Sequence, residues 1–89
     1  MNENGYLLQP GEFIIAQTRE RLKLGNSIAC VLSMRGSVAQ TGLDALQTEF
    51  FCEPGCDGQL LLRTINNGPL PIKILPGIVI VKGIFMRVI

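Results

Sequence analysis

The chain is 89 residues long; 47% of its residues are hydrophobic and 17% are charged. A chain of this size buries only about 60–65% of its unfolded surface, and an average domain carries roughly 25% charged residues. We therefore expect a single domain, residues 1–89, with apolar surface that a second copy covers. The net charge of +1 comes from scattered basic residues, so no basic stripe for polymeric nucleic acid is predicted.

Neither end of the chain has the pattern of a membrane segment. The first four residues are polar, which argues against a secretory signal peptide. Residues 70–89 are apolar, but three basic residues and a Pro-Gly pair interrupt them, and their β-branched side chains favour strands. We expect a cytoplasmic protein with no membrane partner.

The three cysteines, Cys30, Cys52 and Cys56, are an odd number in a chain without histidine. A complete disulfide framework is therefore not predicted, and two thiols four residues apart cannot fill a tetrahedral zinc site. We interpret all three as small buried hydrophobic side chains in a reducing cytoplasm, and we expect no intrinsic metal or other cofactor.

Pro-Gly pairs at 10–11, 54–55 and 76–77 are typical of turns. Runs of strand character lie between the turn signals, at residues 12–18, 28–34, 59–65, 71–75, 77–81 and 84–89. In the second run, Ile28, Cys30, Leu32 and Met34 alternate onto one face. The charged run 19–23 is expected to be a solvated segment. Short strands separated by turns predict an all-β sandwich or barrel.

One segment departs from the strand pattern. Residues 37–42 predict a single helical turn, with Ser37 as a possible N-cap and Gly42 just after its end. Residues 44–53 are interpreted as strand with loop.

Five short motifs then occur in a recognisable order. They are Leu-Gln-Pro-Gly-Glu-Phe at 8–13, Arg-Gly-Ser-Val-Ala-Gln-Thr-Gly-Leu at 35–43, Cys-Glu-Pro-Gly-Cys-Asp-Gly at 52–58, Asn-Asn-Gly-Pro-Leu-Pro-Ile at 66–72 and Pro-Gly-Ile-Val-Ile at 76–80. Together they resemble the trimeric dUTPase and dCTP deaminase family over about residues 7–86. The resemblance implies a shortened, distorted jelly-roll subunit in a homotrimer. It also implies nucleotide sites between subunits, with Mg²⁺ accompanying a bound triphosphate.

The positions that the resemblance assigns to deamination are changed. Arg63 falls where the family has the glutamate that moves protons, and a guanidinium cannot act as a base at neutral pH. Gln40 falls on the family's second arginine and Gly36 on its first serine. Deamination by the family mechanism is therefore not expected.

The positions for dUTP hydrolysis are partly kept. Glu53 falls on the aspartate that activates water, and it is one methylene longer. Cys56 falls on the aromatic that packs against the nucleoside, and Lys82 on a glutamine. Glu53 is the one candidate catalytic residue, and its structural alternative is a turn carboxylate or a partner for an arginine.

The positions that hold phosphates in the family keep anion-binding groups. Arg35 offers forked donors, Ser37 a hydroxyl, and Gly36 room for backbone N–H groups. We include Gln40, Arg63 and Lys82 in this predicted nucleotide-binding set. The alternatives are an ion pair across the trimer for Arg35, a helix cap for Ser37, and a solvent-facing strand position for Arg63.

Three functions stay open at this point. The first is a trimer that binds or sequesters a nucleotide or nucleotide-derived signal without turnover. Small relatives are frequent in phage genomes, so this form could be viral and act in the host cytoplasm. The second is a reduced dUTP diphosphatase that uses Glu53. The third is a structural or protein-binding trimer.

Overall fold

The computed structural model describes residues 5–46 and 50–88, and nearly all their regular structure is β. The elements in chain order are β1 (Tyr6–Leu8), β2 (Phe13–Lys23), β3 (Ile28–Met34), α1 (Gly36–Ala39), β4 (Leu43–Asp44), β5 (Phe51–Cys52), β6 (Asp57–Asn66), β7 (Ile72–Ile74) and β8 (Val81–Arg87). The expected all-β fold with one short helical turn is confirmed.

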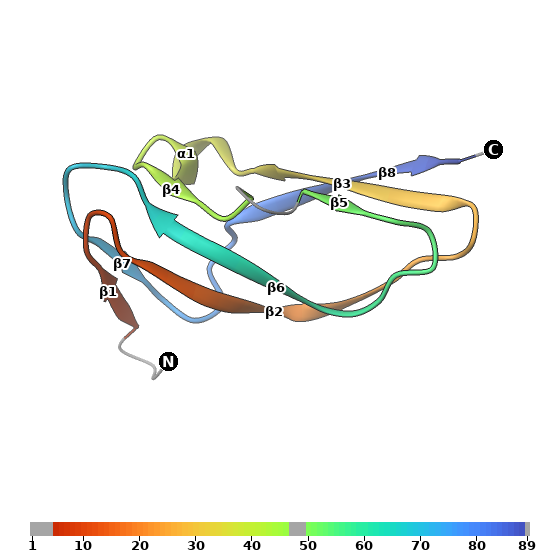
Figure 1. Cartoon of the computed structure of the whole chain (residues 1–89), viewed down its shortest axis with the longest axis horizontal. Coiled ribbons are helices and arrows are strands. Elements are labelled where there is room, and N and C mark those ends of the chain that lie inside the picture. The colour runs from red at the N-terminus through yellow and green to blue at the C-terminus, as the bar shows by residue number, and fades with distance from the viewer. Residues whose placement is uncertain (1–4, 47–49, 89) are drawn as a thin grey trace.

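The strands form three antiparallel sheets, ordered β2-β6-β4, β5-β3-β8 and β1-β7. Figure 1 shows the two three-stranded sheets as facing layers, with β1 and β7 at the end that also carries α1. Such facing layers are the sandwich arrangement in which inward side chains of both sheets make one core.

The core consists of two clusters of buried apolar side chains. The larger one lies between the facing sheets and contains Leu24, Cys30, Leu32, Ala45, Cys52 and Leu62. The smaller one contains Leu8, Leu43 and Ile74 near α1. The predicted alternation along β3 is confirmed, because Ile28 and Met34 pack against the same cluster as Cys30 and Leu32. Cys30 and Cys52 are buried as expected, and Cys56 is half-buried.

Strand β2 is longer than the predicted run, because it continues through the charged residues to Lys23. The register with β6 shifts between Gln17 and Arg21, and the Leu60 N–H donates to the Thr18 hydroxyl at 2.8 Å within the shift. Residues 21–23 then pair with residues 57–59. The four charged side chains of the expected solvated segment are exposed, whereas Leu22 packs against the larger cluster. The pairing of residues 21–23 with a strand more than thirty residues away is not encoded in local composition.

The predicted strand at 77–81 is wrong. Residues 76–77 make a turn and 78–80 have no regular structure, whereas β8 begins at Val81 and runs through Gly83. The ladder with β3 starts at the pair Met34–Val81. Beyond this pair one more hydrogen bond joins the segments, from the Arg35 N–H to the Ile80 carbonyl at 2.8 Å, and the chain then enters α1.

A buried asparagine joins β6 to both of its neighbouring turns. The Asn66 side chain, with no exposed surface, donates to the carbonyls of Leu8 at 3.0 Å and Leu70 at 2.8 Å. Its carbonyl oxygen accepts from the Gly68 N–H at 2.8 Å. Every polar atom of this side chain thus has a partner, which explains why the 66–72 motif suits this fold.

Candidate functional site

Arg35 and α1 form the centre of the predicted phosphate site. Arg35 continues β3 with an extended backbone (φ −65°, ψ 127°) and is the N-cap of α1. Its carbonyl accepts from Val38 at 3.0 Å and Ala39 at 2.9 Å, so the N–H groups of Gly36 and Ser37 precede the first intrahelical bonds. Both residues and the Arg35 side chain are exposed. This turn therefore presents backbone and side-chain donors to solvent.

The predicted capping role of Ser37 is wrong. Arg35 is the N-cap, without a side-chain capping bond, and Ser37 lies inside the helical turn. The helix begins one residue earlier than expected because the β3–β8 ladder delivers Arg35 in an extended conformation. Gln40 is the C-cap, and Gly42 follows two residues later with a φ of +95°. The Ser37 hydroxyl, which caps nothing, is available to a ligand.

Lys82 lies on the same face and at the same end of the sheet as Arg35. It is directly opposite Ser33 in the β3–β8 ladder, and strand alternation directs Ser33, Arg35 and Lys82 to one face. Lys82 is exposed, as is Gln40 at the end of α1. The structure thus gathers five of the six predicted nucleotide-binding residues, Arg35, Gly36, Ser37, Gln40 and Lys82, around one turn.

Arg63 lies on the other sheet, away from this group. It is opposite Ile15 on the outer face of β2-β6-β4, and its guanidinium carbon is 4.1 Å from the centre of the Phe13 ring. This cation–π contact places it on an exposed apolar surface with Ile15 (66% exposed) and Leu61 (62%). Within one chain, Arg63 therefore occupies a solvent-facing strand position, which was the alternative considered for it.

Glu53 lies in the turn between β5 and β6, in the half of the molecule away from α1 (Figure 1). Its side chain is exposed beside a hollow of about 410 Å³ that residues 51–56 line. Among the described residues the only salt bridge joins Arg21 to Asp57 at 3.1 Å, so Glu53 makes none with them. One subunit therefore does not bring Glu53 to the Arg35 group.

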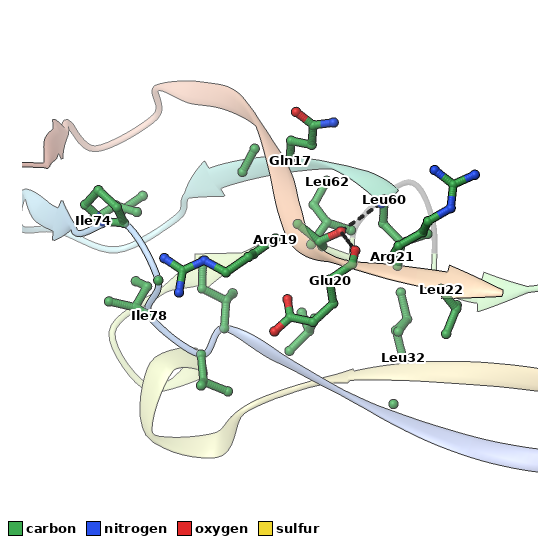
Figure 2. Close-up of a pocket in the computed structure, with 18 of the residues that line it drawn as sticks. Gln17, Arg19, Glu20, Arg21, Leu22, Leu32, Leu60, Leu62, Ile74 and Ile78 are labelled. Atoms are coloured by element: carbon green, nitrogen blue, oxygen red, sulfur yellow. Dashed lines mark hydrogen bonds between the residues drawn. The ribbon is translucent and has the colours of Figure 1, made fainter. Parts of the chain in front are cut away.

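Sequence patterns did not indicate a second hollow, which lies between the two sheets. A cavity of about 720 Å³, lined by apolar side chains and by the polar residues of β2, opens between the two sheets, bounded by β2, the segment 74–80 and β8. Figure 2 shows Arg19 and Glu20 on β2 at this cavity, with Arg19 reaching toward Ile78. A cavity between strands more than fifty residues apart has no local signal.

Two further observations concern ions and membranes. In residues 5–46 and 50–88, no three or more Cys, Asp or Glu side chains gather to hold a metal ion. Nor does that part of the chain contain a helix long and apolar enough to cross a membrane.

Comparison with known proteins identifies the lineage. The family model described as dCTP deaminase-like matches residues 1–88. The chain belongs to the dCTP deaminase-like family. Among its relatives is the "dCTP deaminase, dUMP-forming" of Tropheryma whipplei (strain Twist), 38% identical over 82 residues, which cover 92% of this chain and 42% of that protein. The protein of the same name from Thermobifida fusca is 40% identical over 72 residues, covering 81% and 37%.

A third relative, from Pseudarthrobacter chlorophenolicus, has the same name and is 35% identical over 85 residues, covering 96% of this chain and 44% of its own. The chain therefore spans about two-fifths of the length of the curated relatives it matches. The expected family membership and β fold are confirmed by these matches and by the strand arrangement.

Proposed function

We propose that this chain associates with copies of itself, as a trimer, and binds a nucleotide through its phosphates without deaminating it. The phosphate-binding residues in this proposal are Arg35, Ser37 and Lys82, with the backbone N–H of Gly36 and the side chain of Gln40 beside them. The ligand is a nucleoside triphosphate with Mg²⁺, or a smaller signal derived from a nucleotide.

The observation that carries this proposal is the contrast between two arginines. Arg63, at the position that the resemblance gives to a proton-transferring glutamate, stacks on Phe13 and supplies no base. Arg35 is exposed beside the open N–H groups of Gly36 and Ser37, and charge-assisted hydrogen bonds from such donors favour phosphate oxygens. Binding is therefore supported where the family's deamination chemistry is not.

Self-association is supported by the separation of the predicted residues. Arg35, Arg63 and Glu53 lie on different faces of one chain, so a site that uses more than one of these regions requires neighbouring copies. The exposed apolar side chains of Phe13, Ile15 and Leu61 offer a surface for such contacts.

Calorimetry tests the binding proposal, with dCTP, dUTP, dTTP and cyclic nucleotides added with and without Mg²⁺. We expect one of them to bind and Arg35→Ala to weaken that binding by about tenfold or more, because a hydrogen bond to a charged group contributes about 1.5–3 kcal/mol. Lys23→Ala removes an exposed charge at the far end of β2 and is the matched control. Absence of binding to every nucleotide would refute the proposal and favour a structural or protein-binding trimer.

A second candidate function is a reduced dUTP diphosphatase that uses Glu53 as its base. The exposed carboxylate beside the hollow of residues 51–56 favours it, since a general base must reach the attacking water. Pyrophosphate release from dUTP and Mg²⁺, abolished in Glu53→Gln, would support this function. No release at high protein concentration would remove it.

A further inference from the structure

Strand β8 is an unpaired edge. In the described residues it pairs with β3 alone, at the end of the sheet β5-β3-β8, and all seven residues keep one continuous register. In an antiparallel ladder, alternate residues direct their N–H and C=O groups away from the partner strand. The free side of β8 therefore presents a row of backbone donors and acceptors that another strand can satisfy.

Most of the usual protections of an edge strand are lacking along the middle of β8. It contains neither proline nor bulge, and its central residues are apolar and exposed: Ile84 by 54%, Phe85 by 59% and Met86 by 42%. Basic residues stand only toward its ends, at Lys82 and Arg87. An exposed, bulge-free edge with an apolar centre is a template for strand addition.

β8 also borders the cavity between the sheets. Gly83 and Phe85 line that cavity, on the face that carries Cys30 and Leu32. A Cβ at Gly83 would stand 2.8 Å from the Cys30 sulfur, so only glycine fits there without a shift. Because Gly83 has no side chain, a neighbouring aromatic ring can cover its Cα at the edge.

We propose that two copies of this chain pair through β8, antiparallel and centred on Ile84. A two-fold axis through this point sets Ile84 opposite the partner's Ile84 and Gly83 opposite the partner's Phe85. The register follows from the strand itself, because only a centre at residue 84 pairs all seven residues from 81 to 87. The ring of Phe85 then covers the glycine on the cavity side, and the two sheets become one sheet of six strands.

This register is compatible with the charged residues of β8. Lys82 lies opposite the partner's Met86, and Val81 opposite the partner's Arg87, so no two like charges face one another. A second copy as the occupant is supported because this register pairs all seven residues of β8 and sets no two like charges opposite one another.

This contact shares Lys82 with the proposed nucleotide site but uses no other residue of that site, and it is distinct from the proposed trimer contact. A two-fold contact uses the same patch on both chains, whereas a three-fold ring joins two different patches. The pairing therefore does not rest on the proposed function. It predicts an even number of chains, two alone or six if trimers also form.

Sedimentation of the whole chain, with Ile84→Lys as the variant, tests the pairing. The substitution places two lysines directly opposite one another, so we expect the number of chains in the particle to halve. Leu70→Lys adds the same charge at an exposed leucine outside β8 and is expected to leave the number unchanged. A wild-type particle of one or three chains, or an even particle that Ile84→Lys leaves intact, overturns the proposal.

Cross-linking gives a second measurement that does not depend on the lysine variant. Under oxidised glutathione, Ile84→Cys should form a disulfide between two copies, with two thiols oxidised and one glutathione disulfide reduced. The expected result is a covalent dimer on a non-reducing gel, while Leu70→Cys stays a single chain. Failure of Ile84→Cys to cross-link above the Leu70→Cys level contradicts the pairing.

Discussion

The turns that hydrogen-bond around Asn66 (residues 8–12, 42 and 66–70, called the turn cluster below) contrast with the free edge of β8. In both places backbone polar groups need partners, but only the turn cluster supplies them within one chain. At Asn66 one buried side chain makes three hydrogen bonds to carbonyl and N–H groups of the surrounding chain. Along β8 the described residues leave one whole side unpaired and keep large apolar side chains exposed.

The comparison distinguishes polar groups that are hydrogen-bonded within one chain from groups that stay open to a ligand or a second chain. The 66–72 motif and Gly42 serve packing, because Asn67 donates to the Gly42 carbonyl at 2.8 Å and the two turns touch through backbone. The altered positions Arg63, Gln40 and Lys82 are all exposed, and the turn cluster does not involve them. This fold therefore tolerates changes of chemistry at these positions without a change of architecture.

The largest effect is expected from Asn66→Ala. The substitution leaves the carbonyls of Leu8 and Leu70 and the N–H of Gly68 without these partners, so it should cost about 3 kcal/mol of stability or more. Chemical denaturation measures the loss. Asn67→Ala, at an exposed neighbouring position, should stay within about 0.5 kcal/mol. Equal effects of the two substitutions would show that the buried side chain is not the organising feature of this end.

A smaller effect, about 2 kcal/mol, is expected from Gly42→Ala. Gly42 has a φ of +95°, and a Cβ there would stand 2.5 Å from the Gly68 nitrogen, so the two turns would have to separate. Gly25→Ala is the control, because a Cβ at Gly25 meets no atom within 4 Å. If thermal unfolding gives the two variants the same midpoint, the close backbone approach does not stabilise the cluster.

The smallest effect is a pH dependence at the exposed rim of the turn cluster. A hydrogen bond from the Tyr6 hydroxyl, and a second one from the Gln9 N–H at 2.9 Å, hold the pKa of Glu12 below its ordinary value of 4.5. Because the folded pKa is the lower one, this stabilisation is present above the ordinary pKa and is lost as pH falls through the folded value.

Melting temperatures from neutral pH down to about pH 3 measure this dependence. Glu12→Gln should remove part of the loss of stability on acidification, and Tyr6→Phe should reduce it in the same direction. Glu20→Gln, which changes an exposed carboxylate of β2, is the control. Acid sensitivity that is the same in wild type and Glu12→Gln would contradict the role of this carboxylate.

Some residues of the candidate site lie together because they are close in sequence, and others because strands pair. That Arg35, Gly36, Ser37 and Gln40 lie around one turn follows from their closeness in sequence, and the helical turn itself was predictable. That Lys82 joins them depends on the β3–β8 ladder, whose partners lie about fifty residues apart. The location of Arg63 on Phe13 likewise required the β2–β6 pairing.

By itself the sequence determined the β class, the Pro-Gly turns, the alternation of β3 and the single helical turn, because each depends on neighbours within a few residues. Only the tertiary structure decided that the charged residues 19–23 extend β2, that β8 starts at Val81, and that Arg35 rather than Ser37 caps α1. It also decided which strand edges stay open. The physical reason is that strand pairing joins distant segments, and the partner across the ladder sets where each strand begins and ends.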